Sequence, residues 1–232
     1  MLTNFFKTVD SYGAMLNKLA ISNFFVCLIA FYFLTSQSPA LQRFVNDLPL
    51  QISISGLKLN IAYIIPPLLL AIIFRAIKLH DKISTVFQIR AYYDWNYILK
   101  PMIKSVEVEI QKEVAISHRR TLMSNVFYKY VSSKHPEPVV DKHIIEMVLD
   151  QLTWYWMMIE NAFITFIMCI ILVWLGALEH LLPLFYLALG LVIFSKYLQL
   201  AAAKYTAQEV ETILASHRRK QEIKEQFNAV QD

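Results

Sequence analysis

Four apolar stretches dominate this chain of 232 residues. A helix rises about 1.5 Å per residue, so roughly 20 mostly apolar residues are needed to cross about 30 Å of hydrocarbon. All four stretches reach that length once their flanks are included, and the chain as a whole is 56% hydrophobic. The sequence therefore predicts an all-α polytopic membrane protein with four transmembrane helices, built around Leu19 to Thr35, Ile61 to Phe74, Phe163 to Ala177 and Leu181 to Ser195.

These stretches divide the chain into five expected segments. The segments are an interfacial amphipathic helix, a first pair of transmembrane helices with an outer loop (37–60), a helical cytoplasmic domain, a second pair of transmembrane helices and a cytoplasmic helical tail, at residues 1–18, 19–78, 79–152, 153–203 and 204–232. The first segment has an apolar face that suits either the inner membrane interface or the protein's own cytoplasmic domain.

Local sequence features refine the first pair of spans. Pro66 and Pro67 remove two backbone donors and crowd the preceding turn, which predicts a kink or a late helix start in the second span. Residues 51–60 alternate between polar and apolar side chains around Ser55-Gly56, which predicts a small extracytoplasmic hairpin.

Lys and Arg are distributed unevenly between the two sides of the predicted spans. The connection from Leu79 to Leu152 holds ten of them and the segment from Lys196 onward holds six, whereas the outer loop has only Arg43 and Lys58. Because basic residues near a span resist translocation, we expect the long connection and both termini in the cytoplasm. The predicted location is the cell inner membrane, with a multi-pass topology.

The expected cytoplasmic domain is nearly neutral and has no glycine. Its ten basic residues face nine acidic ones, whereas nucleic-acid-binding surfaces carry a clear basic excess, so general nucleic-acid binding is not expected. A phosphate-cradling loop needs glycines where the backbone approaches the phosphate, so this kind of nucleotide site is not expected either. The candidate contacts with a partner or with lipid headgroups are Arg75, His80, His118, Arg119, Arg120, His217, Arg218 and Arg219. The alternative for the basic clusters is a solvated helix face.

Helical periodicity continues beyond the last two spans. Apolar residues from Ile144 to Leu152 run without interruption into the third span, which predicts a helix longer than the bilayer is thick. A break is expected before it, at residues 135–138. After the fourth span an imperfect apolar stripe suits packing against a partner helix, and its members are Val210, Ile213, His217, Ile223 and Phe227.

One string in the sequence resembles an enzyme motif. Arg75 and His80 have the spacing of the RxxxxH signature of HEPN-type ribonucleases, which would imply a membrane-tethered nuclease. The alternative is that Arg75 reaches lipid headgroups where the second span leaves the membrane. His143, Glu146 and Asp150 share a helix face, but a metal site needs three or four ligands and no second motif supplies them. We therefore expect a non-enzymatic protein without a metal or cofactor.

Ionisable side chains inside a span are costly in lipid and usually face protein or water. Glu160 lies about one turn inside the third span, and Lys196 closes the fourth span at a similar depth. Because a tight outer turn joins these two spans, their inner ends are antiparallel neighbours. The sequence therefore predicts an intramembrane Glu160–Lys196 pair, with structural pairing as its simplest role and gating or proton movement as the alternative.

Three hypotheses for function follow from this pattern. The first is a non-enzymatic inner-membrane protein that self-associates and provides a cytoplasmic helical platform for a soluble partner, acting as an anchor, sensor or scaffold. Small polytopic proteins of this type occur as accessory parts of bacterial operons, including anti-phage defence systems. The second is an oligomeric channel or membrane-permeabilising effector, and the third is the RxxxxH nuclease. The expected partners are the lipid bilayer, further copies of the chain and a soluble cytoplasmic protein.

Overall fold

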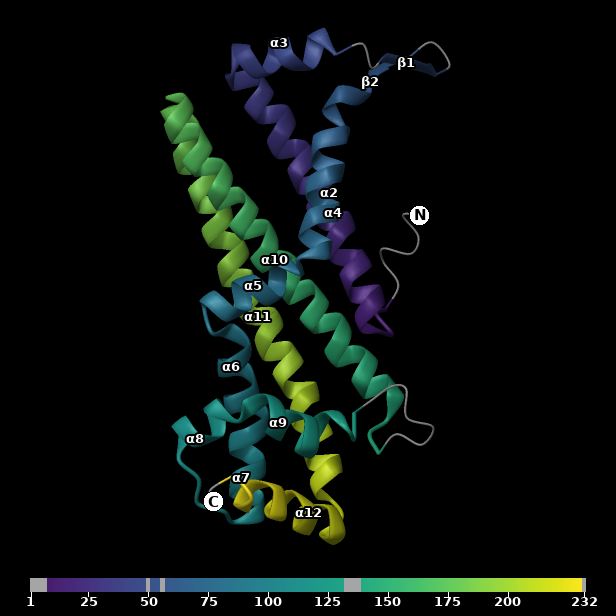
Figure 1. The fold of residues 1–232 in the computed structure, drawn as a ribbon, viewed down its shortest axis with the longest axis vertical. Coiled ribbons are helices and arrows are strands. Elements are labelled where there is room, and N and C mark those ends of the chain that lie inside the picture. Colours follow the sequence, from purple (N-terminus) through teal and green to yellow (C-terminus); the bar gives the residue numbers. More distant parts are fainter. Residues whose placement is uncertain (1–7, 49–50, 55–56, 132–138, 231–232) are drawn as a thin grey trace. The chain divides into compact units, whose positions relative to one another are not determined.

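The computed structural model describes residues 8–48, 51–54, 57–131 and 139–230 (Figure 1). This part of the chain is almost entirely helical, in agreement with the predicted all-α class. It divides into two compact units. Among the described residues, unit 1 contains 13–82 and 153–197, and unit 2 contains 8–12, 83–152 and 198–230.

Unit 1 is built on long apolar helices. Three helices of the described residues are long and apolar enough to cross a membrane: α2 (Tyr12–Gln37), α10 (Lys142–Leu175) and α11 (Leu181–Leu214). A bent helix pair raises this number to four if the pair counts as one span. These helices expose large apolar side chains, as expected of a surface that faces lipid; examples are Ile29, Tyr32, Leu69, Ile72, Trp174 and Ile193.

The predicted second span is interrupted rather than continuous. The short 3-10 helix η1 (Ile61–Tyr63) precedes α4 (Ile65–Ala76), and α4 has proline in its first turn, which confirms the expected late helix start. α5 (Leu79–Val86) then follows at an angle of 61°. Lys78, between the two helices, has a φ of 52°, and this left-handed conformation ends the first helix and redirects the chain.

The N-terminal segment does not form a separate helix where it is described. α2 begins at Tyr12 and continues without a break into the first apolar stretch, with Met15 and Lys18 already buried. The predicted interfacial helix over 1–18 is therefore wrong for residues 12–18, because the helix that starts there is the first span itself. Residues 1–7 lie outside the described part.

A short helix and a hairpin connect α2 to η1. The side chain of Ser38 caps the N-terminus of α3 (Pro39–Asp47), a helix that the sequence analysis did not anticipate. β1 (Gln51–Ile54) and β2 (Leu57–Asn60) pair antiparallel over the segment with alternating residues, the first residue of β1 opposite the last of β2. The predicted turn at Ser55-Gly56 lies outside the described residues.

α10 and α11 each contain 34 residues, a length of about 51 Å that exceeds the roughly 30 Å of hydrocarbon and confirms the predicted long helix. The short 3-10 helix η4 (Leu178–His180) joins them. Gly176 ends α10 with a φ of 77°. Its N–H donates to the carbonyl of Val173 at 3.1 Å, and that of Ala177 donates to Leu172 at 3.0 Å, which is a Schellman motif.

Unit 2 packs short helices around one apolar core (Figure 1). Its remaining elements are α6 (Ile89–Asp94), η2 (Trp95–Leu99), α7 (Lys100–Val106), α8 (Lys112–Ser117), α9 (Arg119–Met123), η3 (Ser124–Tyr128) and α12 (His217–Asn228), of which η2 and η3 are π-helical. The break predicted at residues 135–138 falls outside the described part.

The apolar stripe of the tail belongs to the core of unit 2. Val210 and Ile213 of α11, together with Ile223 and Phe227 of α12, are buried there. Only the fifth member of the predicted stripe, His217, is exposed. The expectation that this stripe contacts a partner helix is therefore corrected: a break at residues 215–216 lets α12 fold back and bury the stripe within its own chain.

Candidate functional site

Three polar side chains from distant parts of the chain meet inside unit 1. Asn23 of α2, His80 of α5 and Glu160 of α10 form what we call the buried polar cluster. Asn23 Nδ2 donates to Glu160 Oε2 at 2.6 Å, and His80 Nδ1 lies 3.5 Å from Glu160 Oε1. The three residues are 2%, 3% and 1% exposed, respectively. A carboxyl group in such surroundings requires hydrogen-bonding or charged partners, and these two side chains provide them.

Adjacent residues extend the cluster. Ser22 and Asn161 form a second polar pair between α2 and α10, in which Asn161 Nδ2 donates to Ser22 Oγ at 3.1 Å. The rings of His80 and Trp156 are 5.7 Å apart, and His80 Nε2 lies 3.6 Å from Oδ1 of the half-exposed Asp81. Two successive polar pairs thus join α2 to α10, while α5 contacts α10 through the His80 imidazole.

The members of the buried polar cluster lie at matching ends of their apolar stretches. Asn23 follows Leu19 by four residues, Glu160 precedes Phe163 by three, and His80 comes just after the apolar part of α4. Polar groups from three separate stretches therefore gather at one level. This arrangement suits the boundary between hydrocarbon and headgroups, where polar groups are more easily accommodated than at the bilayer centre.

One buried atom of the cluster has no partner. Among the described residues, Asn23 Oδ1 is the buried side-chain oxygen or nitrogen for which the structure shows no hydrogen bond. An unpaired acceptor of this kind costs about 1–3 kcal/mol. Reversing the amide would not remove the cost, because its oxygen would then face the Glu160 carboxylate. The bond between Asn23 and Glu160 therefore has to offset the penalty of the unpaired oxygen.

The predicted Glu160–Lys196 pair is replaced by other contacts in the described part of the chain. The partners of Glu160 come from α2 and α5, not from α11, on which Lys196 lies. The physical reason is the turn at Lys78, which directs His80 toward α10, together with the polar position of Asn23 inside the first apolar stretch. Sequence reasoning considered only the two helices joined by the outer turn.

Arg75 and His80, the pair that resembles a nuclease signature, have different partners. Arg75 Nη2 donates to Asn17 Oδ1 at 2.8 Å on an exposed surface. His80 is buried against Glu160. The turn at Lys78 separates the two residues, so each side chain serves a contact between helices of unit 1.

The first basic cluster, residues 118–120, lies on α9 and the residue before it. Arg119 forms an ion pair with Asp94 of α6. Burial raises the pKa of Asp94, and the charges of Arg119 and Arg90 oppose that rise. His118 Nδ1 lies 3.2 Å from the carbonyl of Val114, one turn earlier, while Arg120 is exposed. One of the three candidate residues is therefore committed to holding α6 and α9 together.

The second basic cluster, residues 217–219, anchors α12. Arg219 Nε and Nη2 donate to the carbonyls of Ile213 and Thr212 at 2.7 and 2.9 Å, which satisfies the C-terminus of α11. Arg218 Nε donates to Glu222 Oε1 at 3.0 Å within α12. His217 is exposed at the start of the helix. Two of the three candidates thus have a role in the fold of unit 2.

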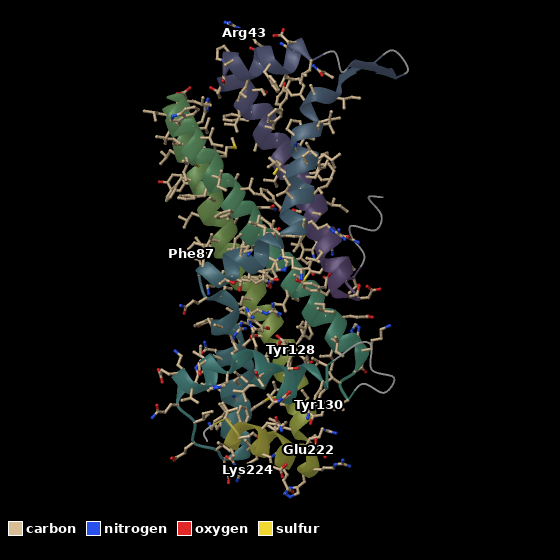
Figure 2. The ribbon with its side chains drawn as sticks, in the orientation of Figure 1. Arg43, Phe87, Tyr128, Tyr130, Glu222 and Lys224 are labelled. Carbon is tan, nitrogen blue, oxygen red and sulfur yellow. The ribbon has the colours of Figure 1, made fainter. Side chains whose placement is uncertain are left out.

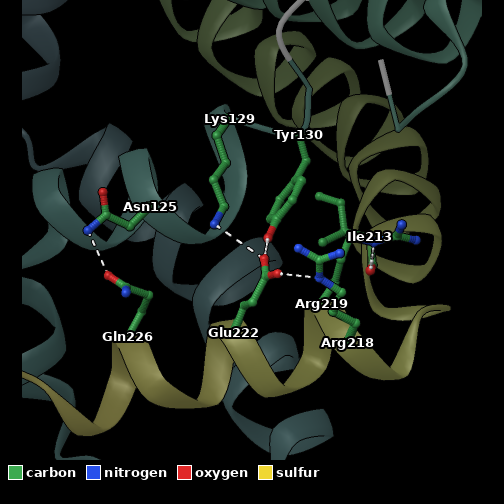
Figure 3. A network of polar contacts seen from close by, with 8 residues as sticks. All are labelled: Asn125, Lys129, Tyr130, Ile213, Arg218, Arg219, Glu222 and Gln226. Atoms are coloured by element: carbon green, nitrogen blue, oxygen red, sulfur yellow. Dashed lines mark hydrogen bonds and ion pairs between the residues drawn. The ribbon is translucent and has the colours of Figure 1, made fainter. Parts of the chain in front are cut away.

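A polar network fastens α12 to the segment around η3 (Figure 3). Tyr130 Oη donates to Glu222 Oε2 at 3.0 Å, and Lys129 Nζ lies 3.9 Å from the same oxygen. One turn further along, Asn125 Nδ2 donates to Gln226 Oε1 at 2.8 Å. The hydrogen bonds from Tyr130 and Arg218 lower the pKa of Glu222, so this carboxylate stays ionised at neutral pH.

Sequence reasoning missed Asn23 and Tyr130 as contributors to these sites. The signal for Asn23 was present, because a polar residue within an apolar stretch usually faces protein. Nothing comparable marks Tyr130, whose partner Glu222 is 92 residues away. The helix face with His143 carries a pair between Lys142 Nζ and Glu146 Oε1 at 3.5 Å. Within the described residues, no group of three or more His, Cys, Asp or Glu side chains is placed to hold a metal ion.

A family model described as the YmfE protein family matches residues 11–229. The chain belongs to the YmfE protein family. The match extends from just before α2 to the end of α12, so both units lie within the region that defines the family. No curated protein and no solved structure matches the chain.

Proposed function

We propose that this member of the YmfE family is a non-enzymatic, multi-pass inner-membrane anchor that presents unit 2 in the cytoplasm as a platform for a soluble partner. The observation that carries the proposal is the course of α10 and α11. Each helix has an apolar part in unit 1 and a second part in the core of unit 2. Two continuous helices therefore run from an apolar helical bundle into a small domain with its own core.

The buried polar cluster favours four crossings over three with a re-entrant segment. α2 runs from the level of Asn23 to Gln37, about 21 Å at 1.5 Å per residue. For His80 to meet Asn23 and Glu160, the chain must return to the starting level of α2. The segment Ile61–Ala76 contains about 16 residues, or about 24 Å, and covers that return. A re-entrant segment would leave His80 at the opposite level.

The basic residues support the cytoplasmic placement of unit 2 and of both termini. Most Lys and Arg of the chain belong to residues 83–152 and 198–232. The connection between α2 and α4 has only Arg43 and Lys58. Retention of basic segments on the cytoplasmic side then gives one consistent topology for all four crossings.

A role without catalysis is supported by the contacts of the enzyme-like pair. Arg75 is bonded to Asn17, and His80 is packed between Trp156 and Glu160. A general acid or base must reach the reacting group within about 3 Å in a substrate complex. The contacts of His80 instead join α5 to α10, which is what an anchoring bundle requires.

Topology reporters test the membrane proposal. Fusions of alkaline phosphatase and of a fluorescent protein after residue 48 and after residue 117 place each reporter at an expected outer or cytoplasmic position. We expect phosphatase activity only at 48 and fluorescence only at 117, with all of the protein in the carbonate-resistant membrane fraction. The reverse pattern, or release by carbonate, would refute the orientation or the membrane placement.

Purification in a mild detergent tests the platform role. We expect a soluble protein to be retained in fixed stoichiometry by the complete chain, and to be lost when Tyr130→Phe and Glu222→Ala loosen α12 while the membrane fraction is unchanged. Self-association is measured on the same sample by light scattering. Ion flux through liposomes that contain only this protein would instead favour the channel hypothesis.

A further inference from the structure

Two exposed apolar residues lie at the C-terminal end of α5, its last residue Val86 and the following Phe87. Val86 is 74% exposed and Phe87 is 65% exposed. They follow each other directly in sequence, and Figure 2 labels Phe87 at the junction of α5 and α6. Helical spacing places both residues on the same stripe as Leu79 and Ile83, which are buried earlier in α5. The apolar stripe of α5 is thus covered at its start and exposed at its tip.

Local contacts hold this tip in a defined corner. The N–H of Phe87 donates to the carbonyl of Ile83 at 3.0 Å, which keeps Phe87 in the last turn of α5. Gln88 has a φ of 53°, so the chain turns sharply after Phe87. The N–H of Arg90 donates to Ser84 Oγ at 3.1 Å across the turn. Phe87 is thus presented outward by a hydrogen-bonded corner.

The bend between α4 and α5 sets the distance of this corner from the end of α4. α5 has eight residues, and its axis makes 61° with α4. Eight residues at 1.5 Å are about 12 Å, of which only about 6 Å lies along the axis of α4. If α4 is tilted by about 20°, the average for transmembrane helices, the component of α5 along the bilayer normal is about 2–9 Å. The headgroup layer is about 5–7 Å thick on each side of the bilayer.

We infer that α5 is an interfacial helix whose Val86–Phe87 tip inserts into the headgroup layer of an anionic bilayer. α5 is too polar to complete a hydrocarbon crossing, because it carries His80, Asp81 and Lys82. The exposed Lys82 stands one turn before Val86 and supplies a positive charge beside the apolar tip. The exposed apolar surface of α4 ends at Ile77, immediately before α5, so the lipid-facing surface continues around the bend.

This inference rests on the proposed membrane placement of α4, and hydroxyl-radical footprinting of the unmodified protein in nanodiscs tests both. Each nanodisc contains one copy of the chain in phosphatidylethanolamine and phosphatidylglycerol. The oxidation rate of each residue is divided by its rate in the unfolded chain. Tyr128 is the internal reference, because it is less exposed than Phe87 in the structure, at 40%.

We expect Phe87 to be oxidised several-fold more slowly than Tyr128, in spite of its greater exposure in the structure. Replacing phosphatidylglycerol by phosphatidylcholine should reduce that protection, and Lys82→Gln should make the protection insensitive to the exchange. Oxidation of Phe87 at or above the rate of Tyr128, with Ile72 and Ile73 of α4 protected, would overturn the interfacial tip alone. If Ile72 and Ile73 were also oxidised at solvent-exposed rates, the membrane placement itself would fail. Protection that appears only in discs with two copies would assign the tip to a contact between chains.

Discussion

Removal of the Glu160 side chain is the perturbation that most directly probes unit 1. Glu160→Ala removes the acceptor of Asn23 Nδ2 and the carboxylate beside His80 Nδ1, so neither polar end of the Asn23 amide then has a partner. Removing one member of a buried pair typically costs about 3–5 kcal/mol, because the remaining polar groups stay buried. Asn23→Ala is different: it loses one hydrogen bond but also removes the unpaired oxygen. Because each of these terms is about 1–3 kcal/mol, we expect a net cost of about 1 kcal/mol or less.

The double variant Asn23→Ala/Glu160→Ala tests this prediction most directly, because it measures the coupling energy between the two side chains. Hydrogen bonds between helices in membranes average about 0.6 kcal/mol and reach about 1.7 kcal/mol. The Asn23–Glu160 contact, at 2.6 Å and fully buried, should lie near the upper value. The expected coupling energy is therefore about 1.5 kcal/mol. In a Glu160→Ala background, Asn23→Ala should then increase stability slightly, because the amide removed has no partner left at either end.

Unfolding in mixed micelles of a mild detergent and dodecyl sulfate, followed by circular dichroism, measures these free energies. Thr165→Ala is the matched control, since Thr165 is buried on α10 but donates only to the carbonyl of Asn161 on the same helix. The control should be additive with Asn23→Ala. A coupling energy below about 0.5 kcal/mol, the usual error of additivity, would refute the assignment of a stabilising contact between α2 and α10.

Four further substitutions probe the helix α11, the turn after α10, and unit 2. Gly176→Ala should cost about 1 kcal/mol in the same titration, because the left-handed φ penalises a Cβ although no atom crowds it, whereas Gly190→Ala within α11 should gain up to about 1 kcal/mol. Phe227→Ala should lower the stability of unit 2 by about 3–5 kcal/mol in thermal unfolding, because the ring is fully buried. The lowered pKa of Glu222 means that its stabilisation is present above the ordinary carboxyl range and is lost as the pH falls through the folded-state value. Hydrogen exchange in α12 should therefore accelerate in acid beyond its intrinsic pH dependence, and Tyr130→Phe should reduce that difference.

The long apolar helices were predictable because the thickness of hydrocarbon fixes their length. α2 and α11 each contain one of the predicted stretches, and α10 contains all but the last two residues of another. The late start of α4 was also predictable, since Pro66 and Pro67 restrict the backbone directly. The turn at Lys78 was not. A left-handed φ is uncommon for lysine, so no local propensity indicates it.

Periodicity identified buried faces correctly but not the surfaces that bury them. The stripe formed by Val210, Ile213, Ile223 and Phe227 is a buried helix face, yet it packs in the core of unit 2 rather than on a partner. A stripe reports that water is excluded from one side of a helix, and the identity of the covering surface depends on residues far away in sequence.

Polar residues in apolar stretches show the same limit of sequence reasoning, and they also indicate a better criterion for predicting their partners. Glu160 was recognised as needing a partner, and proximity along the chain suggested Lys196, whereas Asn23, its actual hydrogen-bond donor, is 137 residues away. Depth is the stronger criterion. A polar group in hydrocarbon can be satisfied only by another at the same level, so each polar residue should be matched by its distance from the end of its own span. By that rule Asn23 was a candidate for Glu160 in the sequence itself, because each lies within about one turn of the first residue of its stretch.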